Sequence, residues 1–312
     1  MNEEINRRHD RFITGGSIVY LVGISALMLR HNIWFSPDQF FIFALVAAVI
    51  FGRGKKFISD WAPIILIFLS YEFFHGALPA ILKFPVHSTD LIALEKFLFG
   101  SIPTVVLQQR FLSPGHFSIF DFLFSLTYMA FWIVPLIFLF WLWMRYHQVF
   151  KFIILAFFIG LYATFITMTF FPAMPPWMAA ERGLIDPIQR VLYQTTAYLT
   201  VPGALPTLYQ YFRGNEVAAM PSVHAEIPTL MFLAALLVKN KLLILLTLAY
   251  SLLTYVSIVY LGEHWAIDAI AGIFYAFGAC WGAKFVGEKL NLIHASAYRT
   301  TITSPRGVIS TK

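Results

Sequence analysis

The sequence predicts an all-α integral membrane protein with about eight transmembrane helices. Of its 312 residues, 59% are hydrophobic and only 12% carry a charge, whereas an average soluble domain has about 25% charged residues. A soluble protein with so few charges could not cover its surface with polar groups. The composition therefore excludes a soluble globular enzyme, a disordered tail and a nucleic-acid-binding module, and the length fits one membrane domain.

Eight apolar runs are long enough, or nearly so, to cross a bilayer, whose hydrocarbon core takes about 20 helical residues. They cover residues 15–31, 38–52, 58–78, 120–144, 148–171, 223–239, 241–261 and 264–286. The run at 38–52 is short, which indicates a tilted helix or a locally thinned bilayer. Two long connections, 79–119 and 172–222, separate the runs. Residues 91–100 in the first connection are expected to form an interfacial amphipathic helix.

The runs divide the chain into three predicted parts. Residues 1–57 hold the N-terminal tail and two accessory transmembrane helices, residues 58–290 form a six-helix membrane domain, and residues 291–312 form a cytoplasmic tail. No small-residue cleavage site follows the first apolar run, so we expect it to be retained as a span. The single cysteine, Cys280, excludes an intrachain disulfide and a cysteine metal cluster.

Basic residues predict the orientation of the chain. If the N-terminus is cytoplasmic, fifteen of the 22 lysines and arginines fall on the cytoplasmic side, including those in the tight loops at 53–56 and 239–241. Cytoplasmic loops are the ones that carry such an excess. We therefore expect both termini in the cytoplasm. The two long connections then lie on the extracytoplasmic face, which is periplasmic, lumenal or exterior.

Near that face, the residues His264 and Asp268 could carry chemistry. Polar groups at membrane depth are costly and are therefore candidates for function. The spacing of four residues puts both side chains on one helical face at the start of the last span. Asp268 could accept a hydrogen bond from one ring nitrogen of His264 and raise the basicity of the other, which suits attack on phosphorus. Taken alone, the pair fits an ordinary helix-surface ion pair better.

The segment PSVH at 221–224 is a second candidate. Ser222 is expected to be the N-cap of the following helix, so that His224 lies in the first turn. The free N–H groups of that turn suit a phosphate, and His224 could protonate a leaving oxygen. Alone, an ordinary helix start is the commoner explanation, but the predicted orientation puts His224 and His264 on the same membrane face, where they could meet.

Together the two segments resemble a known family. PSVH, and SIVYLGEHWAID at 257–268, are similar to the second and third motifs of the type 2 phosphatidic acid phosphatase superfamily, which read PSGH and SRxxxxxHxxxD. These variants, with FPAMPPWMAA at 171–180, are more similar to the branch that contains inositol phosphorylceramide synthases. The resemblance covers about 120–286 and implies a six-helix catalytic core within residues 58–290.

The resemblance implies a mechanism without metal or other cofactor. His264 would attack the phosphoryl group and form a phosphohistidine, and Asp268 would orient and stabilise it. His224 would protonate the departing alkoxide. Ser222 and its backbone N–H would hold phosphate oxygens. Water or an alcohol would then attack the phosphohistidine.

The sequence departs from the family in its positive charges. The first motif, KxxxxxxRP, is missing, and Ile258 stands where the third motif has arginine. Phosphoryl transfer needs positive charge against the phosphate oxygens. We expect Arg213 and Arg182, both in the connection at 172–222, to bind the phosphate instead. Three further residues are candidate contacts to the substrate: Glu226, Glu263 and Arg190.

The sequence thus predicts a membrane-embedded lipid phosphatase or phosphotransferase, with transfer of a phospho-headgroup in sphingolipid metabolism favoured by the resemblance. Simple hydrolysis of a lipid phosphate or a polyprenyl pyrophosphate is the alternative. A lipid transporter or scramblase is the alternative from another class, although it would be expected to carry mid-bilayer charges or repeat symmetry, and neither is evident. The expected partners are a lipid phosphate ester, water or an alcohol, and the membrane, with no nucleic acid.

Overall fold

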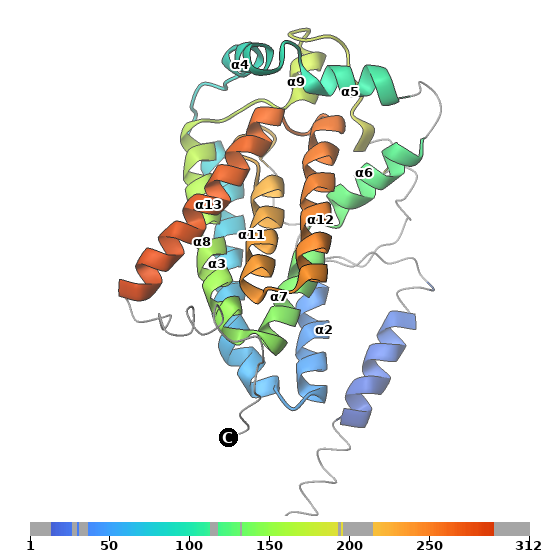
Figure 1. Ribbon diagram of the computed structural model, residues 1–312, viewed down its shortest axis with the longest axis vertical. Helices are drawn as coiled ribbons and strands as arrows, with labels where there is room; N and C mark the ends of the chain where they lie inside the picture. Colours follow the sequence, from blue (N-terminus) through green and yellow to red (C-terminus); the bar gives the residue numbers. More distant parts are fainter. Residues whose placement is uncertain are drawn as a thin grey trace, which may run out of the picture. The chain divides into compact units, whose positions relative to one another are not determined.

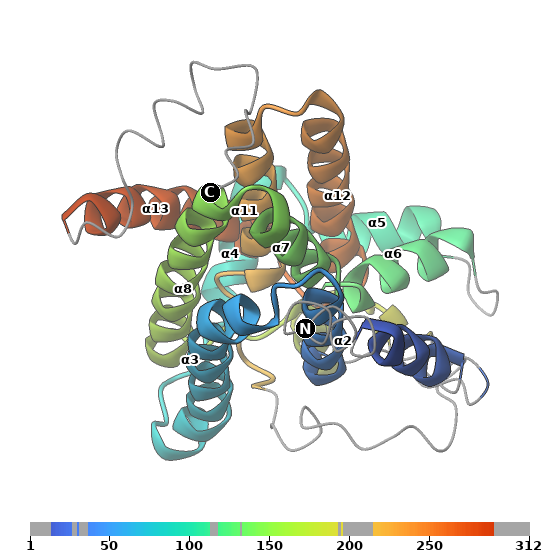
Figure 2. The same cartoon turned by 90° about the horizontal axis from the view of Figure 1, so that it is seen from below.

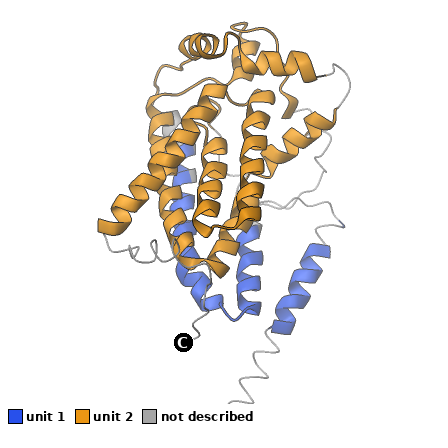
Figure 3. Cartoon of the chain, viewed as in Figure 1, with its two compact units in different colours: residues 1–80, 198–214 blue, residues 81–197, 215–312 orange. Residues whose placement is uncertain are grey.

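The computed structural model describes residues 14–26, 30, 37–112, 118–131, 133–192, 195 and 215–289. These residues form helices and connections without a β-strand, so the predicted all-α class is confirmed for them. The chain divides into two compact units (Figure 3). Unit 1 comprises residues 1–80 and 198–214, and unit 2 comprises residues 81–197 and 215–312. The sequence-based division at residues 57 and 290 stays a prediction.

Unit 1 contains a helix over Thr14–Ala26, α2 over Pro37–Ile50 and nearly all of α3, which covers Gly54–Ile81. The turn between α2 and α3 includes Gly52 with a φ of 68°, which a residue without a side chain adopts readily. Trp61 of α3 is fully buried and its ring stacks on Phe57, with the ring centroids 5.4 Å apart.

Unit 2 is a helical bundle with three short helices over one end (Figure 1). Its helices are α4 (Thr89–Phe99), α5 (Pro103–Phe111), α6 (Ile119–Met129), α7 (Ile133–Arg145), α8 (His147–Phe170), α9 (Pro176–Glu181), α11 (Val223–Val238), α12 (Lys241–Tyr260) and α13 (Ala266–Lys289). Helix α11 contacts α8, α12 and α13. Figures 1 and 2 show α13 on one side of α11 and α12 on the other, while α4, α5 and α9 lie beyond the bundle's end.

Several helices are apolar enough to cross a membrane, so the protein is an integral membrane protein. Four qualify by length and composition: the part of α3 over Gly54–His75, α8, α12 and α13. The pair α6 and α7 is a fifth if it counts as one bent span. The remaining predicted runs form shorter apolar helices, at Thr14–Ala26, Phe40–Ile50 and α11. The predicted total of eight spans, like the orientation of the termini, stays a prediction.

The run at 120–144 is not one straight helix, which corrects the prediction. It forms α6 and α7, whose axes differ by 49° across a short break. Pro135 in the first turn of α7 explains the break, because proline has no N–H to continue the hydrogen-bond ladder and its ring clashes with the carbonyl of residue 131. The bend places Tyr128 and Phe131 beside His224, one of the predicted site residues.

The connection at 79–119 holds two helices instead of the one expected. α4 agrees with the expected amphipathic helix, and it ends at Gly100, which has a left-handed φ of 71°. α5 follows with Pro103 at its first position, where the missing N–H costs nothing. Buried apolar side chains of both helices, such as Leu91 and Val105, pack with Trp265 near the start of α13.

Isolated β-bridges join the two long connections to each other. His87 pairs with Ala173, and Ala173 pairs with Ala218. The N–H of Ala173 donates to the carbonyl oxygen of Val217 at 2.7 Å. The segment FPAMPP therefore lies between two other extended segments at this end of the bundle, next to the residues predicted to carry chemistry.

Candidate active site

Two histidines from segments 40 residues apart are in contact in unit 2. Nε2 of His264 lies 3.2 Å from Nδ1 of His224. His264 belongs to the loop between α12 and α13, and His224 to the first turn of α11. A phosphorus atom between the two nitrogens would have a nucleophile on one side and a proton donor on the other, which is the arrangement that in-line displacement requires.

The ring of His264 is buried and its tautomer follows from one hydrogen bond. Only 5% of the residue is exposed, and Nδ1 lies 2.8 Å from the carbonyl oxygen of Ala219. A carbonyl oxygen can only accept, so Nδ1 carries the hydrogen and donates it. In the neutral ring, Nε2 is then left with a lone pair that points toward His224.

Asp268 does not accept the hydrogen bond that the sequence led us to expect. Its Oδ2 lies 3.7 Å from Nδ1 of His264, which is an ion-pair distance and too long for a hydrogen bond. The same oxygen accepts from the backbone N–H of Trp265 at 2.8 Å. Asp268 is therefore engaged in capping its own helix, and the carbonyl oxygen of Ala219 accepts the hydrogen bond from the histidine instead. Its carboxylate can still stabilise positive charge on His264.

The loop that carries His264 is held by three hydrogen bonds with two other segments. The N–H of Trp177 donates to the carbonyl oxygen of Gly262 at 3.0 Å, and the indole N–H of Trp265 donates to that of Met174 at 2.7 Å. The side-chain amide of Gln108 donates to the carbonyl oxygen of Tyr260 at 2.8 Å. The segment FPAMPPW, which carried part of the family resemblance, thus holds the loop through two of these hydrogen bonds.

Aromatic rings position His224. Its ring stacks on Tyr128, with centroids 4.4 Å apart and planes 18° apart, and lies 4.0 Å from the centroid of Phe131. Both aromatic residues lie at the bend between α6 and α7. Sequence reasoning missed them, because nothing distinguishes two aromatic residues in a chain that is 18% aromatic.

Ser222 connects the two motifs through its backbone. It is the N-cap residue of α11, and its N–H donates to the carbonyl oxygen of Asp268 at 3.0 Å. Its side chain makes no capping hydrogen bond, and its buried hydroxyl has no partner among the described residues. The N–H groups of Val223 and His224 have no acceptor within the helix. These donors suit an anion beside His224.

Gly272 allows the two helices to approach this closely. A Cβ atom at this position would lie 2.2 Å from the carbonyl oxygen of Ser222 and 3.1 Å from Cβ of Ala225. Only glycine fits without moving one backbone away from the other. The distance between the start of α11 and the start of α13, and hence between the two histidines, depends on this contact.

The structure describes one of the two arginines that were predicted to bind phosphate. Arg182 is exposed at the end of α9, and Arg213 lies outside the described residues. Arg190 stacks over Trp177, with its central carbon 3.9 Å from the ring centroid, and its Nε lies 3.0 Å from the carboxylate of Glu263. The two predicted substrate contacts Arg190 and Glu263 therefore form an ion pair directly beside His264.

Glu226 lies between helices, apart from the histidine pair. Its Oε2 accepts from the hydroxyl of Thr164 on α8 at 2.8 Å, and a Cβ atom at Gly160 would lie 1.7 Å from Oε1. A role for this carboxyl as a substrate contact stays a prediction. Ile258, at the position of the family's arginine, is fully buried in an apolar cluster with Ala225 and Ala269, so this position offers no positive charge.

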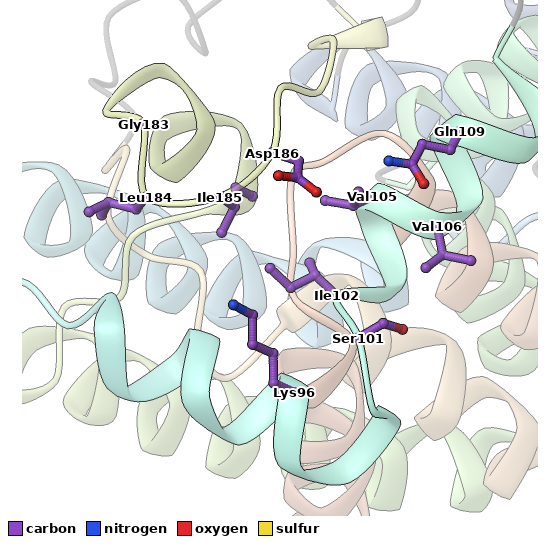
Figure 4. A pocket seen from close by; sticks show the side chains of 10 residues that line it. All are labelled: Lys96, Ser101, Ile102, Val105, Val106, Gln109, Gly183, Leu184, Ile185 and Asp186. Atoms are coloured by element: carbon purple, nitrogen blue, oxygen red, sulfur yellow. The ribbon is translucent and has the colours of Figure 1, made fainter.

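A cavity of about 410 Å³ lies between α4, α5 and residues 183–186 (Figure 4). It is lined by Lys96, Ser101, Ile102, Val105, Val106, Gln109, Gly183, Leu184, Ile185 and Asp186. None of these was predicted as a site residue. In the described part of the chain, no three side chains of the His, Cys, Asp and Glu types are grouped so that they could hold a metal ion.

A family model described as PAP2 superfamily matches residues 89–282, which is more than half of the chain. The chain therefore belongs to the PAP2 superfamily. The match begins earlier than the resemblance at 120–286 suggested, because it includes α4 and α5. No curated protein and no solved structure matches the chain significantly. Membership indicates a phosphatase-type function on lipid phosphates in a membrane protein.

Proposed function

We propose that this member of the PAP2 superfamily transfers a phosphoryl group from a lipid phosphate ester to His264, and from there to water or an alcohol, at the extracytoplasmic face. The contact between Nε2 of His264 and Nδ1 of His224 carries the proposal. Because the hydrogen bond to Ala219 leaves the lone pair on Nε2, the nucleophilic nitrogen already faces the proton donor.

In the first step, the phosphate enters between the two nitrogens and replaces their direct contact. Nε2 forms the bond to phosphorus while the bond to the lipid oxygen breaks. His224 enters this step as the imidazolium, gives the proton on Nδ1 to that oxygen and is left neutral. His264 gains positive charge in this step. The carboxylate of Asp268, 3.7 Å from Nδ1, stabilises that charge.

The phosphate oxygens need donors and positive charge. The unpartnered hydroxyl of Ser222 and the first N–H groups of α11 are suited to hold them. Arg190 is the arginine best supported as the cation, because it stacks on Trp177 and pairs with Glu263, which precedes the nucleophile in the same loop. Arg182 and Arg213 remain proposed contacts to the phosphate.

In the second step, His224 takes a proton from the acceptor, which attacks phosphorus as the bond to Nε2 breaks. We favour an alcohol as acceptor and hence phospho-headgroup transfer, as the resemblance to inositol phosphorylceramide synthases implies. Glu226 and Glu263 are then candidate contacts to a hydroxylated acceptor. Simple hydrolysis of a lipid phosphate or polyprenyl pyrophosphate uses the same residues with water as acceptor.

A lipid screen with the purified protein tests this function. It measures free phosphate release and headgroup exchange, with and without inositol or another alcohol. We expect His264→Ala to lower turnover by at least about 10³-fold, since the nucleophile is lost. His147→Asn is the matched control, because His147 lies at the far end of α8. A fully active His264→Ala variant would disprove the mechanism.

The intermediate and the metal requirement are tested separately. A rapid quench of the active protein should trap an acid-labile phosphohistidine that is absent from His264→Ala. Activity should persist in excess chelator. Loss of activity that a divalent ion restores would instead indicate metal-assisted chemistry.

A further inference from the structure

Glu95 is a buried carboxyl on α4, outside the membrane-spanning helices. Glu95 is fully buried, although the neighbouring Lys96 is exposed. Oε1 accepts a hydrogen bond from the backbone N–H of Ile267, 172 positions further along the chain, at 2.9 Å. Ile267 is the second residue of α13. Glu95 therefore reaches from the short outer helix to the start of the helix that carries Asp268.

The first N–H groups of a helix have no acceptor within it, and this end of the helix favours negative charge. At α13 two carboxyls meet this need. Asp268 accepts from the N–H of Trp265, and Glu95 accepts from the N–H of Ile267. One carboxyl comes from the helix itself and the other from α4, so the start of α13 is held from two sides.

Each of the two carboxyls has an oxygen that remains unsatisfied. Oε2 of Glu95 and Oδ1 of Asp268 are both buried without a hydrogen-bond partner among the described residues. Burial, followed by the negative charge of Asp268, raises the pKa of Glu95 to about 7, against its hydrogen bonds from the start of α13. The two carboxyls accept from N–H groups only two residues apart, those of Trp265 and Ile267. Neighbouring buried carboxyls resist ionising together, so a single negative charge is favoured.

Other charged groups near α4 do not alter this conclusion. Asp268 is the one ionisable group that acts on the pKa of Glu95. The other titratable groups on the segments that pack with α4 are His264, next to Asp268, the ion pair of Arg190 and Glu263, and five exposed residues: Arg110, Glu181, Arg182, Asp186 and Glu216. Asp90 and Lys96 of α4 itself are exposed as well.

We propose that Glu95 is a positioning residue for the reaction: it takes the proton of the carboxyl pair, so that the single negative charge stays on Asp268 beside His264. This inference rests on the proposed function of His264 as nucleophile. Glu95 touches neither the substrate nor the histidine. It acts through the start of α13, where it fixes Ile267, and through the charge state of Asp268.

The test compares Glu95→Gln with Glu95→Ala. Glutamine keeps the acceptor for Ile267 and an N–H that imitates the protonated carboxyl, so neutral-pH activity should stay within about 3-fold of the native chain. Alanine removes both, and kcat should fall by about 10- to 100-fold with little change in KM. Asp90→Asn is the control, because Asp90 is an exposed carboxylate on the same helix.

A pH profile separates a positioning role from a merely structural one. Above about pH 7, Glu95 ionises, and repulsion between the two buried carboxylates should displace the start of α13 that both of them hold. The native chain should therefore lose activity above about pH 7, and Glu95→Gln should lack this loss. Superimposable profiles of the native chain and Glu95→Gln would overturn the inference. So would a Glu95→Ala variant as active as Asp90→Asn.

Thermal unfolding in detergent tests the carboxyl pair without any turnover. A carboxyl with a raised pKa in the folded state stabilises the fold at low pH and loses this contribution as pH rises from about 4.5 through 7. The Tm of the native chain should fall over this range relative to Glu95→Gln. If that fall is seen without lipid phosphate turnover, the proposed function is wrong and the carboxyl pair stands. If turnover is seen and the Tm of the two variants changes in parallel with pH, Glu95 does not hold the proton of the carboxyl pair.

Discussion

The two histidines of the site are held in different ways. His264 is nearly fully buried, and a hydrogen bond from Nδ1 to Ala219 determines which nitrogen carries the hydrogen. His224 is held by ring stacking on Tyr128 and by its contact with Phe131. Stacking determines the plane of a ring, whereas a hydrogen bond to a carbonyl oxygen selects one tautomer. The lone pair on Nε2 of His264 in turn requires a hydrogen on Nδ1 of His224.

This difference is consistent with the two chemical roles that we propose. A nucleophile must present the same lone pair in every cycle, and the bond to Ala219 ensures this for His264. A group that first donates a proton and later accepts one needs its ring nitrogens available, and stacking on Tyr128 occupies neither nitrogen of His224. The arrangement thus supports the proposed assignment of His264 as the nucleophile and His224 as the proton-transfer group.

The largest effect should come from exchanging each histidine for asparagine. His264→Asn should form no phosphoenzyme with any substrate. His224→Asn should lose about 10²- to 10⁴-fold in lipid turnover, yet should still form the phosphoenzyme from an aryl phosphate, whose leaving group needs no proton. Rapid-quench labelling distinguishes the two variants. If His224→Asn fails to be labelled by an aryl phosphate, the assignment of roles is wrong.

A smaller but still large effect should follow Gly272→Ala. The new Cβ atom would lie 2.2 Å from the carbonyl oxygen of Ser222 and would push the start of α11 away from α13. A shift of about 1 Å between reacting groups can cost about 10²-fold in rate. Gly278→Ala on the same helix is the control, since nothing lies within 4 Å of the position that its Cβ atom would take. Equal activity of the two variants would show that the close approach is not needed.

The smallest effect should follow loss of the ring stack at His224. Tyr128→Ala should lower kcat about 10-fold, because an aromatic pair contributes about 0.5–1.5 kcal/mol to holding a ring in place. Tyr128→Phe keeps the stack and should remain close to the native rate. If both variants lose activity equally, the phenolic hydroxyl of Tyr128 matters and the stacking explanation does not hold.

Local patterns explain what could be predicted from the sequence. The spacing of His264 and Asp268 defines a helical face, and the pair of motifs identifies both histidines. The expected hydrogen bond between Asp268 and His264 is not formed, because the N–H of Trp265 donates to the carboxylate and the carbonyl oxygen of Ala219 accepts from the histidine. That competition depends on a segment 45 residues away, which helical spacing does not describe.

Glu95 is a clearer example of a residue whose contacts cannot be predicted from local sequence patterns. In the sequence it is one of several polar residues on a short amphipathic stretch, and nothing separates it from its exposed neighbour Lys96. Its burial depends on the packing of α4 on the start of α13. Tyr128 and Phe131 were likewise not identified, because the sequence predicts a straight helix where the bend at Pro135 brings them to His224.

The sequence by itself determined the all-α membrane class, the PSVH and YLGEHWAID segments, and the shortage of phosphate-binding cations, since composition and helical spacing are local properties. The tertiary structure alone decided which carbonyl oxygen accepts the hydrogen bond from His264, which rings hold His224, and that Glu95 contacts the helix of Asp268. These are contacts between residues 45 to 172 positions apart, and they follow from packing, which no periodic pattern encodes.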